Sequence, residues 1–129
     1  MAFGQTPRYN LPEAKIVYAE GDTISAEIAD FDGTNVSSWD FECDVYQQDT
    51  KVITLSSSNG DFTVKGTDSD ILQVDLSSSQ TNNELSLDTD ENEATAYEGV
   101  VKALNAGLTV DPWRFLILKL QVNIYDAEN

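Results

Sequence analysis

Acidic side chains are the groups in this sequence best able to do chemistry, and one acidic segment has the spacing of a metal loop. Asp88, Asp90 and Asn92 place carboxylate or amide oxygens at alternate positions, which is how the calcium loop of an EF-hand begins. The pattern then fails, because Glu93 stands where that loop needs glycine and Gly99 stands where its bidentate glutamate belongs. We predict no metal site, with Asp88, Asp90 and Asn92 as the candidates for a looser cation site and a solvated acidic loop as the simpler interpretation.

The rest of the sequence shows no clear pattern of catalytic residues. The chain has no histidine, which removes the commonest general base and the commonest transition-metal ligand. Among 23 Asp and Glu residues, no pair is singled out for the acid and base roles of a glycosidase. The serines have no Ser-x-x-Lys spacing, and no glycine-rich phosphate loop occurs. We therefore predict that the protein is not an enzyme and uses no cofactor.

The single cysteine, Cys43, belongs to a regular alternation. Trp39, Phe41, Cys43 and Val45 alternate with acidic residues, which is the period of a strand that has one wet face. We predict a buried, unreactive thiol, because the flanking carboxylates also disfavour the thiolate.

Length and charge narrow the class of protein further. A chain of 129 residues corresponds to about one domain. With 7 Lys and Arg against 23 Asp and Glu, the net charge is −16, which repels phosphate. We therefore expect neither nucleic acid nor a membrane as a partner. No run of 18 apolar residues occurs, so no membrane span is predicted.

Short alternating segments separated by turn residues recur about every ten residues, which is typical of a β-sandwich or a β-barrel. An Asn-Gly pair at 59–60 predicts a hairpin between two of these segments. The fold class that we predict is all-β, an antiparallel β-sandwich of about seven strands with one short helix, and the family resemblance given below implies that the sandwich is immunoglobulin-like. The predicted strands cover residues 16–18, 24–28, 39–45, 52–55, 62–64, 72–76 and 113–125.

The helix is predicted from Ala96 to about residue 105. Thr95 and Glu98 fit a capping box, and apolar residues then follow at helical spacing. Residues 82–112 are thus expected to form an acidic loop plus a short helix, inserted in a single domain that spans 14–129. The polar residues from 77 onward are expected to begin that solvated loop.

Two segments supply candidate contact residues. Prolines in residues 1–13 indicate an extended N-terminal arm, either a frayed terminus or an arm that docks on a neighbouring subunit. The last strand carries three apolar residues on the face opposite to its leucines, so a helix or another subunit is expected to cover them. The interface candidates are Pro7, Arg8 and Tyr9 in the arm, and Trp113, Phe115 and Ile117 in the strand.

Several short motifs, taken in order, resemble a known family. Gly21-Asp22-Thr23 opens a strand, a turn at 30–35 and an aromatic strand follow, and Leu76-Ser77-Ser78-Ser79-Gln80-Thr81 comes before the last strand. This order is similar to the small immunoglobulin-like domain of tailed-phage virion proteins, such as the N-terminal domain of baseplate upper proteins. The resemblance covers about residues 16–81 and 113–125, and the sequence departs from the pattern at 82–112.

The resemblance implies a non-enzymatic structural protein of the virion, either a tail, baseplate or head-fibre adaptor or a capsid decoration protein. Its expected partners are other virion proteins in many copies, with a homo-oligomer as a further possibility. The alternative from another class is a carbohydrate-binding or Ca²⁺-dependent adhesion module.

Overall fold

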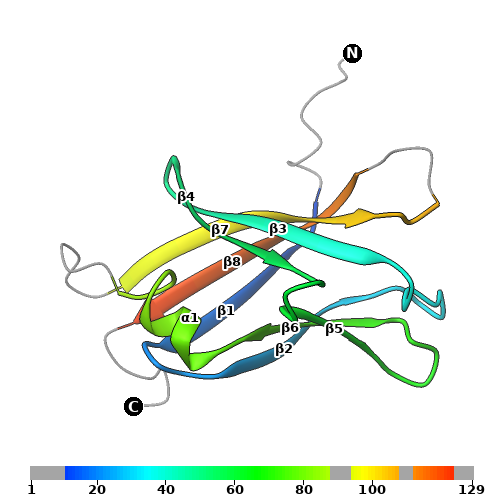
Figure 1. Ribbon diagram of the computed structural model, residues 1–129, viewed down its shortest axis with the longest axis horizontal. Coiled ribbons are helices and arrows are strands. Elements are labelled where there is room, and N and C mark those ends of the chain that lie inside the picture. The colour runs from blue at the N-terminus through cyan, green and yellow to red at the C-terminus, as the bar shows by residue number, and fades with distance from the viewer. Residues whose placement is uncertain (1–10, 88–93, 108–111, 124–129) are drawn as a thin grey trace.

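Two β-sheets pack face to face in the computed structural model of the chain, which describes residues 11–87, 94–107 and 112–123 (Figure 1). The described residues form eight strands and one short helix, so the predicted all-β sandwich is confirmed. The elements are β1 (Glu13–Ala19), β2 (Ile24–Asp30), β3 (Asp40–Gln47), β4 (Thr50–Ser56), β5 (Phe62–Lys65), β6 (Ile71–Leu76), α1 (Ser78–Asn82), β7 (Ala94–Leu104) and β8 (Trp113–Asn123).

The larger sheet has the strand order β1-β8-β7-β3-β4, and the smaller has the order β2-β6-β5. All strand pairs are antiparallel except β1 and β8, which run parallel from the pair Glu13 and Ile117 to the pair Ala19 and Asn123. A parallel pair cannot come from a hairpin, and here the first and last described strands lie side by side although the rest of the domain separates them in sequence.

The core lies between the sheets and is built by period-two alternation. In β3, Phe41, Cys43 and Val45 point inward and are essentially inaccessible to solvent, as predicted. Trp39, the first apolar residue of that alternation, is partly buried and packs against the core. Alternate residues of β6 and β8 are buried as well: Leu72, Val74, Leu118, Leu120 and Val122.

One end of the sandwich is filled by aromatic rings. Phe31, Trp39, Phe41, Trp113 and Phe115 form a cluster in which neighbouring ring centroids lie 5.1 to 6.3 Å apart, in tilted, edge-to-face and stacked pairs. Such geometries suit the ring quadrupoles and add to the burial of apolar area. The cluster therefore fixes the start of β3 and the start of β8 against each other.

The other end is closed by α1 and the residues that follow it (Figure 1). The Tyr18 hydroxyl donates to the Leu85 carbonyl at 2.7 Å, and the Tyr97 hydroxyl donates to the Ser86 carbonyl at 2.5 Å. These hydrogen bonds hold the fully buried Leu85 over the end of the core. Two strands of the large sheet thus anchor the segment that leads out of the helix.

The predicted helix from Ala96 to about 105 is wrong, because these residues lie in β7, in the middle of the larger sheet. The inward positions of β7 include Gly99 and Ala103. Such small residues hide the period of two from a pattern based on large apolar side chains. The helical spacing of Val100, Val101 and Leu104 was therefore fortuitous, and the part of 82–112 from Ala94 to Leu104 is a strand rather than loop and helix.

The helix that does form covers part of the segment predicted to be a polar loop. Ser77 accepts a hydrogen bond from the Gln80 backbone N–H at 3.1 Å, and the Gln80 side chain accepts from the Ser77 N–H at 2.7 Å. This reciprocal pair is a capping box of the type Ser-x-x-Gln. Thr81 is fully buried and donates to the Asp22 carbonyl at 2.8 Å, so the polar helix is tied into the fold.

The hairpin predicted at 59–60 is also wrong, since β4 and β5 belong to different sheets. A turn does form there, with Gly60 at a positive φ of 85°. The buried Asp61 accepts hydrogen bonds from the Ser56 N–H, the Asn59 side chain and the Gln80 side chain at 2.9 to 3.1 Å. These hydrogen bonds stabilise the turn that leads the chain from β4 in one sheet to β5 in the other.

The predicted arm falls mostly in residues 1–10, which lie outside the described residues. At its described end, the Pro12 carbonyl accepts a hydrogen bond from the Ile117 N–H at 2.9 Å, and β1 begins one residue later. Within the ranges that the structure covers, no helix has the length and apolar character needed to cross a membrane.

Candidate functional site

The side of the five-stranded sheet that faces away from the core, called here the outer face, carries ordered rows of side chains. One row crosses all five strands in register, from Lys15 of β1 through Lys119, Glu98 and Tyr46 to Lys51 of β4. Cross-strand neighbours of this kind lie about 5 Å apart, so opposite charges in the row attract one another. Positive, negative and aromatic groups thus form one continuous line.

A second row lies beside the first and is less charged. It runs from Glu13 of β1 through Ile117, Val100 and Asp44 to Thr54 of β4. The Thr54 hydroxyl donates to Asp44 Oδ1 at 2.7 Å. Ile117 is only 5% exposed although it lies outside the core cluster, so this row has a closely packed apolar centre.

Ion pairs connect several charges of the outer face. Lys102 Nζ lies 3.3 Å from Glu42 Oε1, and Lys119 Nζ lies 3.3 Å from Glu13 Oε1. Among the described residues, Lys15 and Arg114 are both exposed and have no acidic side chain within ion-pair distance. Exposed pairs contribute about 0–1 kcal/mol each, so these groups are not needed for folding.

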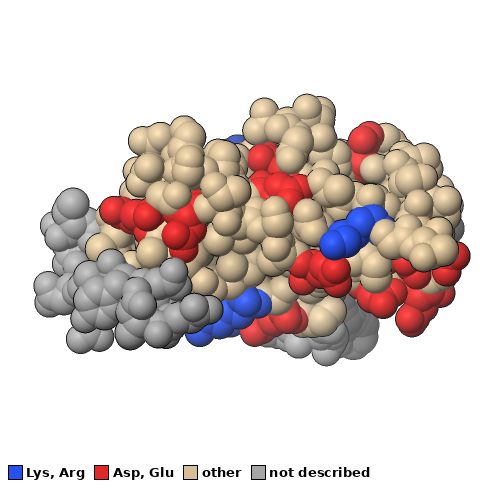
Figure 2. Space-filling model, turned by 90° about the horizontal axis from the view of Figure 1, so that it is seen from below, with Lys and Arg blue, Asp and Glu red and all other residues tan. Residues whose placement is uncertain are grey.

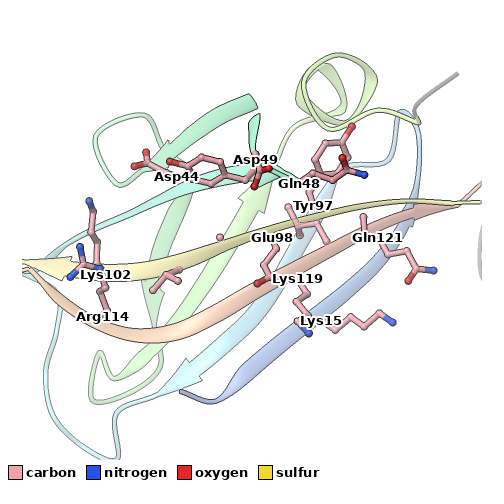
Figure 3. Close-up of a pocket in the computed structure, with 15 residues that line it drawn as sticks. Lys15, Asp44, Gln48, Asp49, Tyr97, Glu98, Lys102, Arg114, Lys119 and Gln121 are labelled. Atoms are coloured by element: carbon pink, nitrogen blue, oxygen red, sulfur yellow. The ribbon is translucent and has the colours of Figure 1, made fainter. Parts of the chain in front are cut away.

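A hollow of about 750 Å³ opens on this face (Figure 3). Its sides come from β1, β8, β7 and β3 and from the turn between β3 and β4, which contributes Gln48 and Asp49. Figure 3 shows Lys102 and Arg114 together at one end of the hollow, with Lys119 farther along and Lys15 beyond it, on the edge strand β1. The hollow is open and broad, which suits a protein surface or an extended ligand better than a small enclosed molecule.

Charge is close to balanced on the outer face, in contrast to the rest of the described surface. The described ranges contain six Lys and Arg and sixteen Asp and Glu. Five of these cations and five of these acids occupy outward strand positions of the outer face, and Asp49 adds a sixth acid at the hollow. Because Asp61 is buried, one cation and nine acids remain for the rest of the described surface. The ten charged residues at strand positions of the outer face are Lys15, Lys51, Lys102, Arg114, Lys119, Glu13, Asp40, Glu42, Asp44 and Glu98.

The large apolar side chains that are most exposed in the described ranges also lie on the outer face. Val17 of β1 is 38% exposed and Tyr46 of β3 is 40% exposed. Between them, Ala96 of β7 is exposed and pairs with Gln121 of β8. Val17 and Tyr46 lie in different rows, so they are separate apolar groups on a charged surface rather than one contiguous patch.

The exposed side of the three-stranded sheet is different, because its polar groups satisfy one another. Asp75 accepts hydrogen bonds from Ser25, Thr63 and Gln73 at 2.5 to 3.0 Å, and Lys65 donates to Gln73 at 3.3 Å. Figure 2, which views the molecule from the side of this sheet, shows many more acidic than basic patches. This side is a solvated polar surface with its hydrogen bonds already made.

The interface candidates from the last strand are divided between the two sides of the sheet. A register shift lies where Val101 pairs with Leu116 and Lys102 with Arg114, so Phe115 is the extra residue of a β-bulge. Trp113 and Phe115 therefore join the internal aromatic cluster, whereas Ile117 lies on the outer face. The expectation that all three share one face is wrong.

The remaining candidates cannot be placed. Pro7, Arg8 and Tyr9, and the cation candidates Asp88, Asp90 and Asn92, lie outside the described residues. Within the described ranges, no three Cys, Asp or Glu side chains gather closely enough to hold a metal ion.

Cys43 has the environment predicted for it. Burial raises the pKa of the Cys43 thiol to about 12, and the charge of Asp44 raises it further while Lys102 lowers it. The pKa of Tyr18 is also raised, first by burial and then by Tyr97 and Glu20. Both groups are therefore protonated and uncharged in the folded protein at neutral pH.

These raised pKa values predict loss of stability in alkali. The folded state favours protonated Cys43, so its contribution is complete below the ordinary thiol pKa near 9 and is lost as the pH rises toward 12. By pH about 11 the loss from Cys43 is on the order of 2 kcal/mol. Urea unfolding from neutral pH upward should show a steeper decline for the wild type than for Cys43→Ala. Equal declines would contradict the assignment.

A scan against models of known protein families and a search of curated proteins both found no match to this chain. What the outer face can do follows from its own groups. Tyr46 and Val17 offer apolar area, the paired charges offer orientation, and Lys15 and Arg114 remain available to acidic groups. One part of the outer face can be recognised in the sequence. Lys119, Gln121 and Asn123 alternate with apolar residues and so mark the polar side of β8.

Proposed function

We propose that this chain is a non-enzymatic structural protein of a tailed-phage virion that works through protein–protein contacts made by its outer face. Within the particle it would serve as a tail, baseplate or head-fibre adaptor, or as a capsid decoration protein. The observation that carries the contact role is the contrast between the two sides of the sandwich. The outer face exposes Val17 and Tyr46 among balanced charges, whereas the other side is a satisfied polar network around Asp75.

Electrostatics supports the choice of this surface. A protein with a net charge of −16 repels other acidic proteins over about a Debye length, which is ~8–10 Å at physiological ionic strength. Close contact costs least where the local charge is near zero. The virion assignment itself rests on the sequence motifs that resemble the phage family, together with the all-β sandwich.

The proposal predicts that the protein is part of purified particles. Phage particles from the strain that carries this gene, purified on a density gradient, should contain the chain by mass spectrometry. Tyr46→Asp places a charge in the contact surface and should lower the amount per particle at least about tenfold. Thr67→Asp adds the same charge in the exposed turn between β5 and β6 and should leave incorporation unchanged. Absence of the wild-type chain from the particles would exclude the virion role.

One observation favours the second candidate function, carbohydrate binding. Tyr46 is exposed at the hollow, whose lining includes the amides of Gln48 and Gln121 and the carboxylate of Asp49. An amphipathic ring with polar groups nearby can hold a sugar ring. A glycan array separates the two functions, since specific binding that Tyr46→Ala abolishes would favour the carbohydrate module. The Ca²⁺-dependent form of this alternative depends on residues outside the described ranges.

A further inference from the structure

We propose that the occupant of the outer face is the outer face of a second copy of this chain, so that two molecules pack sheet against sheet. This inference rests on the proposed contact role of the surface and does not depend on the virion assignment. The features that carry it are the charge balance of the face, the arrangement of signs within its rows, its exposed apolar groups and its area.

Charge balance favours a second copy over a partner of one sign. A strongly basic partner would be drawn to the rest of the described surface, where nine acids accompany one cation. A strongly acidic partner would meet six acids on the outer face, Asp49 included, as well as five cations. A surface that is itself neutral and mixed in sign suits this face best, and a second copy provides one.

The arrangement of signs also fits a two-fold contact. In such a contact each patch meets the same patch of the other molecule, so each group needs its complement within the patch. The row from Lys15 through Lys119 to Glu98 contains both signs, and acids lie in the adjacent positions at Glu13 and Asp44. Lysines of one copy can therefore lie opposite carboxylates of the other. Glu13 and Asp44 already contact Lys119 and Thr54 within one molecule, so Lys15 and Arg114, which have no acidic partner among the described residues, are the cations best placed to reach carboxylates of the other copy.

Apolar contacts supply the attraction that paired surface charges do not. Tyr46, Val17 and Val100 lie on this face, and all three are at least partly exposed. Removing apolar surface from water contributes roughly 25 cal/mol per Å², whereas exposed ion pairs contribute little. Tyrosine is also among the residues enriched at the centres of protein interfaces.

The area of the outer face is more than half of what a standard interface buries on each partner. Five strands at about 4.8 Å spacing span roughly 20 Å, and seven or eight residues at about 3.3 Å extend roughly 25 Å. The projected area is therefore about 500 Å², and the accessible area is larger because side chains corrugate the sheet. A standard interface buries about 800 Å² on each partner. The face is thus large enough to supply most of a dimer contact on its own.

Sedimentation equilibrium of the full chain, from micromolar to millimolar concentration, tests the inference. The wild type should show a monomer–dimer equilibrium. Tyr46→Asp and Val17→Asp should each weaken the dimer at least about tenfold. Thr67→Asp is the matched control, since it adds the same charge away from the outer face, and it should leave the dimer unchanged. Circular dichroism melts establish that each variant is folded.

Salt provides a second readout of the pairing. Each molecule carries −16, so long-range repulsion opposes pairing at low ionic strength. Raising salt to about 0.15 M shortens the Debye length to ~8 Å and should strengthen the dimer, because the desolvated contacts are screened less.

Three results would overturn the inference. These are a monomer at every concentration, a dimer that survives both outer-face substitutions, and a dimer that Thr67→Asp weakens as much as Tyr46→Asp does. The presence of the chain in purified particles is measured independently of its self-association. Failure of the dimer and failure of the virion role are therefore distinguishable.

Discussion

Replacing Leu120 with alanine is expected to lower the free energy of unfolding by about 2–5 kcal/mol. Leu120 is 1% exposed and lies in β8 between Ile16 of β1 and Tyr97 of β7. Its side chain fills the space between the two sheets, and the surrounding strands cannot collapse into the gap without breaking their ladders. Urea unfolding followed by tryptophan fluorescence measures the change.

Gln121→Ala is the control for this substitution. Gln121 is the next residue of β8, but it lies on the outer face and hydrogen-bonds to Asn123 at 2.9 Å. Substitutions at such surface positions usually change stability by less than about 0.5 kcal/mol. If the two variants unfolded alike, the assignment of the two faces of β8 would be wrong.

Replacing Gly99 with alanine is expected to destabilise the domain by about 3 kcal/mol or more, which is at or above the upper end for overpacking. A Cβ atom on Gly99 would lie 2.6 Å from Cys43 Sγ and would overlap the Asp44 carbonyl. That carbonyl belongs to β3, which pairs with β7 from Asp40 to Tyr46. The backbone of β7 cannot move away from β3 without loss of ladder hydrogen bonds, so the steric overlap cannot be relieved at low cost in stability.

Two further variants make the explanation specific. Val100→Ala, at the neighbouring position on the outer face, should cost much less than Gly99→Ala because it removes atoms where there is room. In the double variant with Cys43→Ala, the contact with sulfur is gone but the Asp44 carbonyl remains. The two substitutions should therefore be non-additive, with partial relief of the Gly99→Ala effect. Strict additivity would show that the thiol is not part of the clash.

The strands that could be predicted from the sequence are those with large apolar residues in strict alternation. In β3 three buried residues alternate with acids, and both the strand and the burial of Cys43 were correctly predicted. In β7 the inward positions include Gly99 and Ala103, whose small side chains carry no hydrophobic signal. The close approach of β3 requires glycine at residue 99. The missing side chain that lets β7 pack there is also the reason why the sequence pattern did not reveal a strand.

The sequence pattern could not predict which distant segments pair as neighbouring strands. The turn at 59–60 has the residues of a hairpin, yet Asp61 and its hydrogen bonds direct the chain to the other sheet. A bulge at Phe115 moves one apolar residue to the core side, which a strict period of two cannot anticipate. The outer face depends on such pairing, because its central row takes one residue from each of five strands.

The parallel pairing of β1 with β8 has a mechanical consequence. The chain enters the sheet at Glu13 and leaves it at Asn123, and these two residues lie at opposite ends of the paired strands. Tension applied to the two ends would slide β1 along β8 and load all seven residue pairs together in shear, rather than unzip them one at a time. A domain built in this way resists pulling through its ends far better than one whose terminal strands form a hairpin.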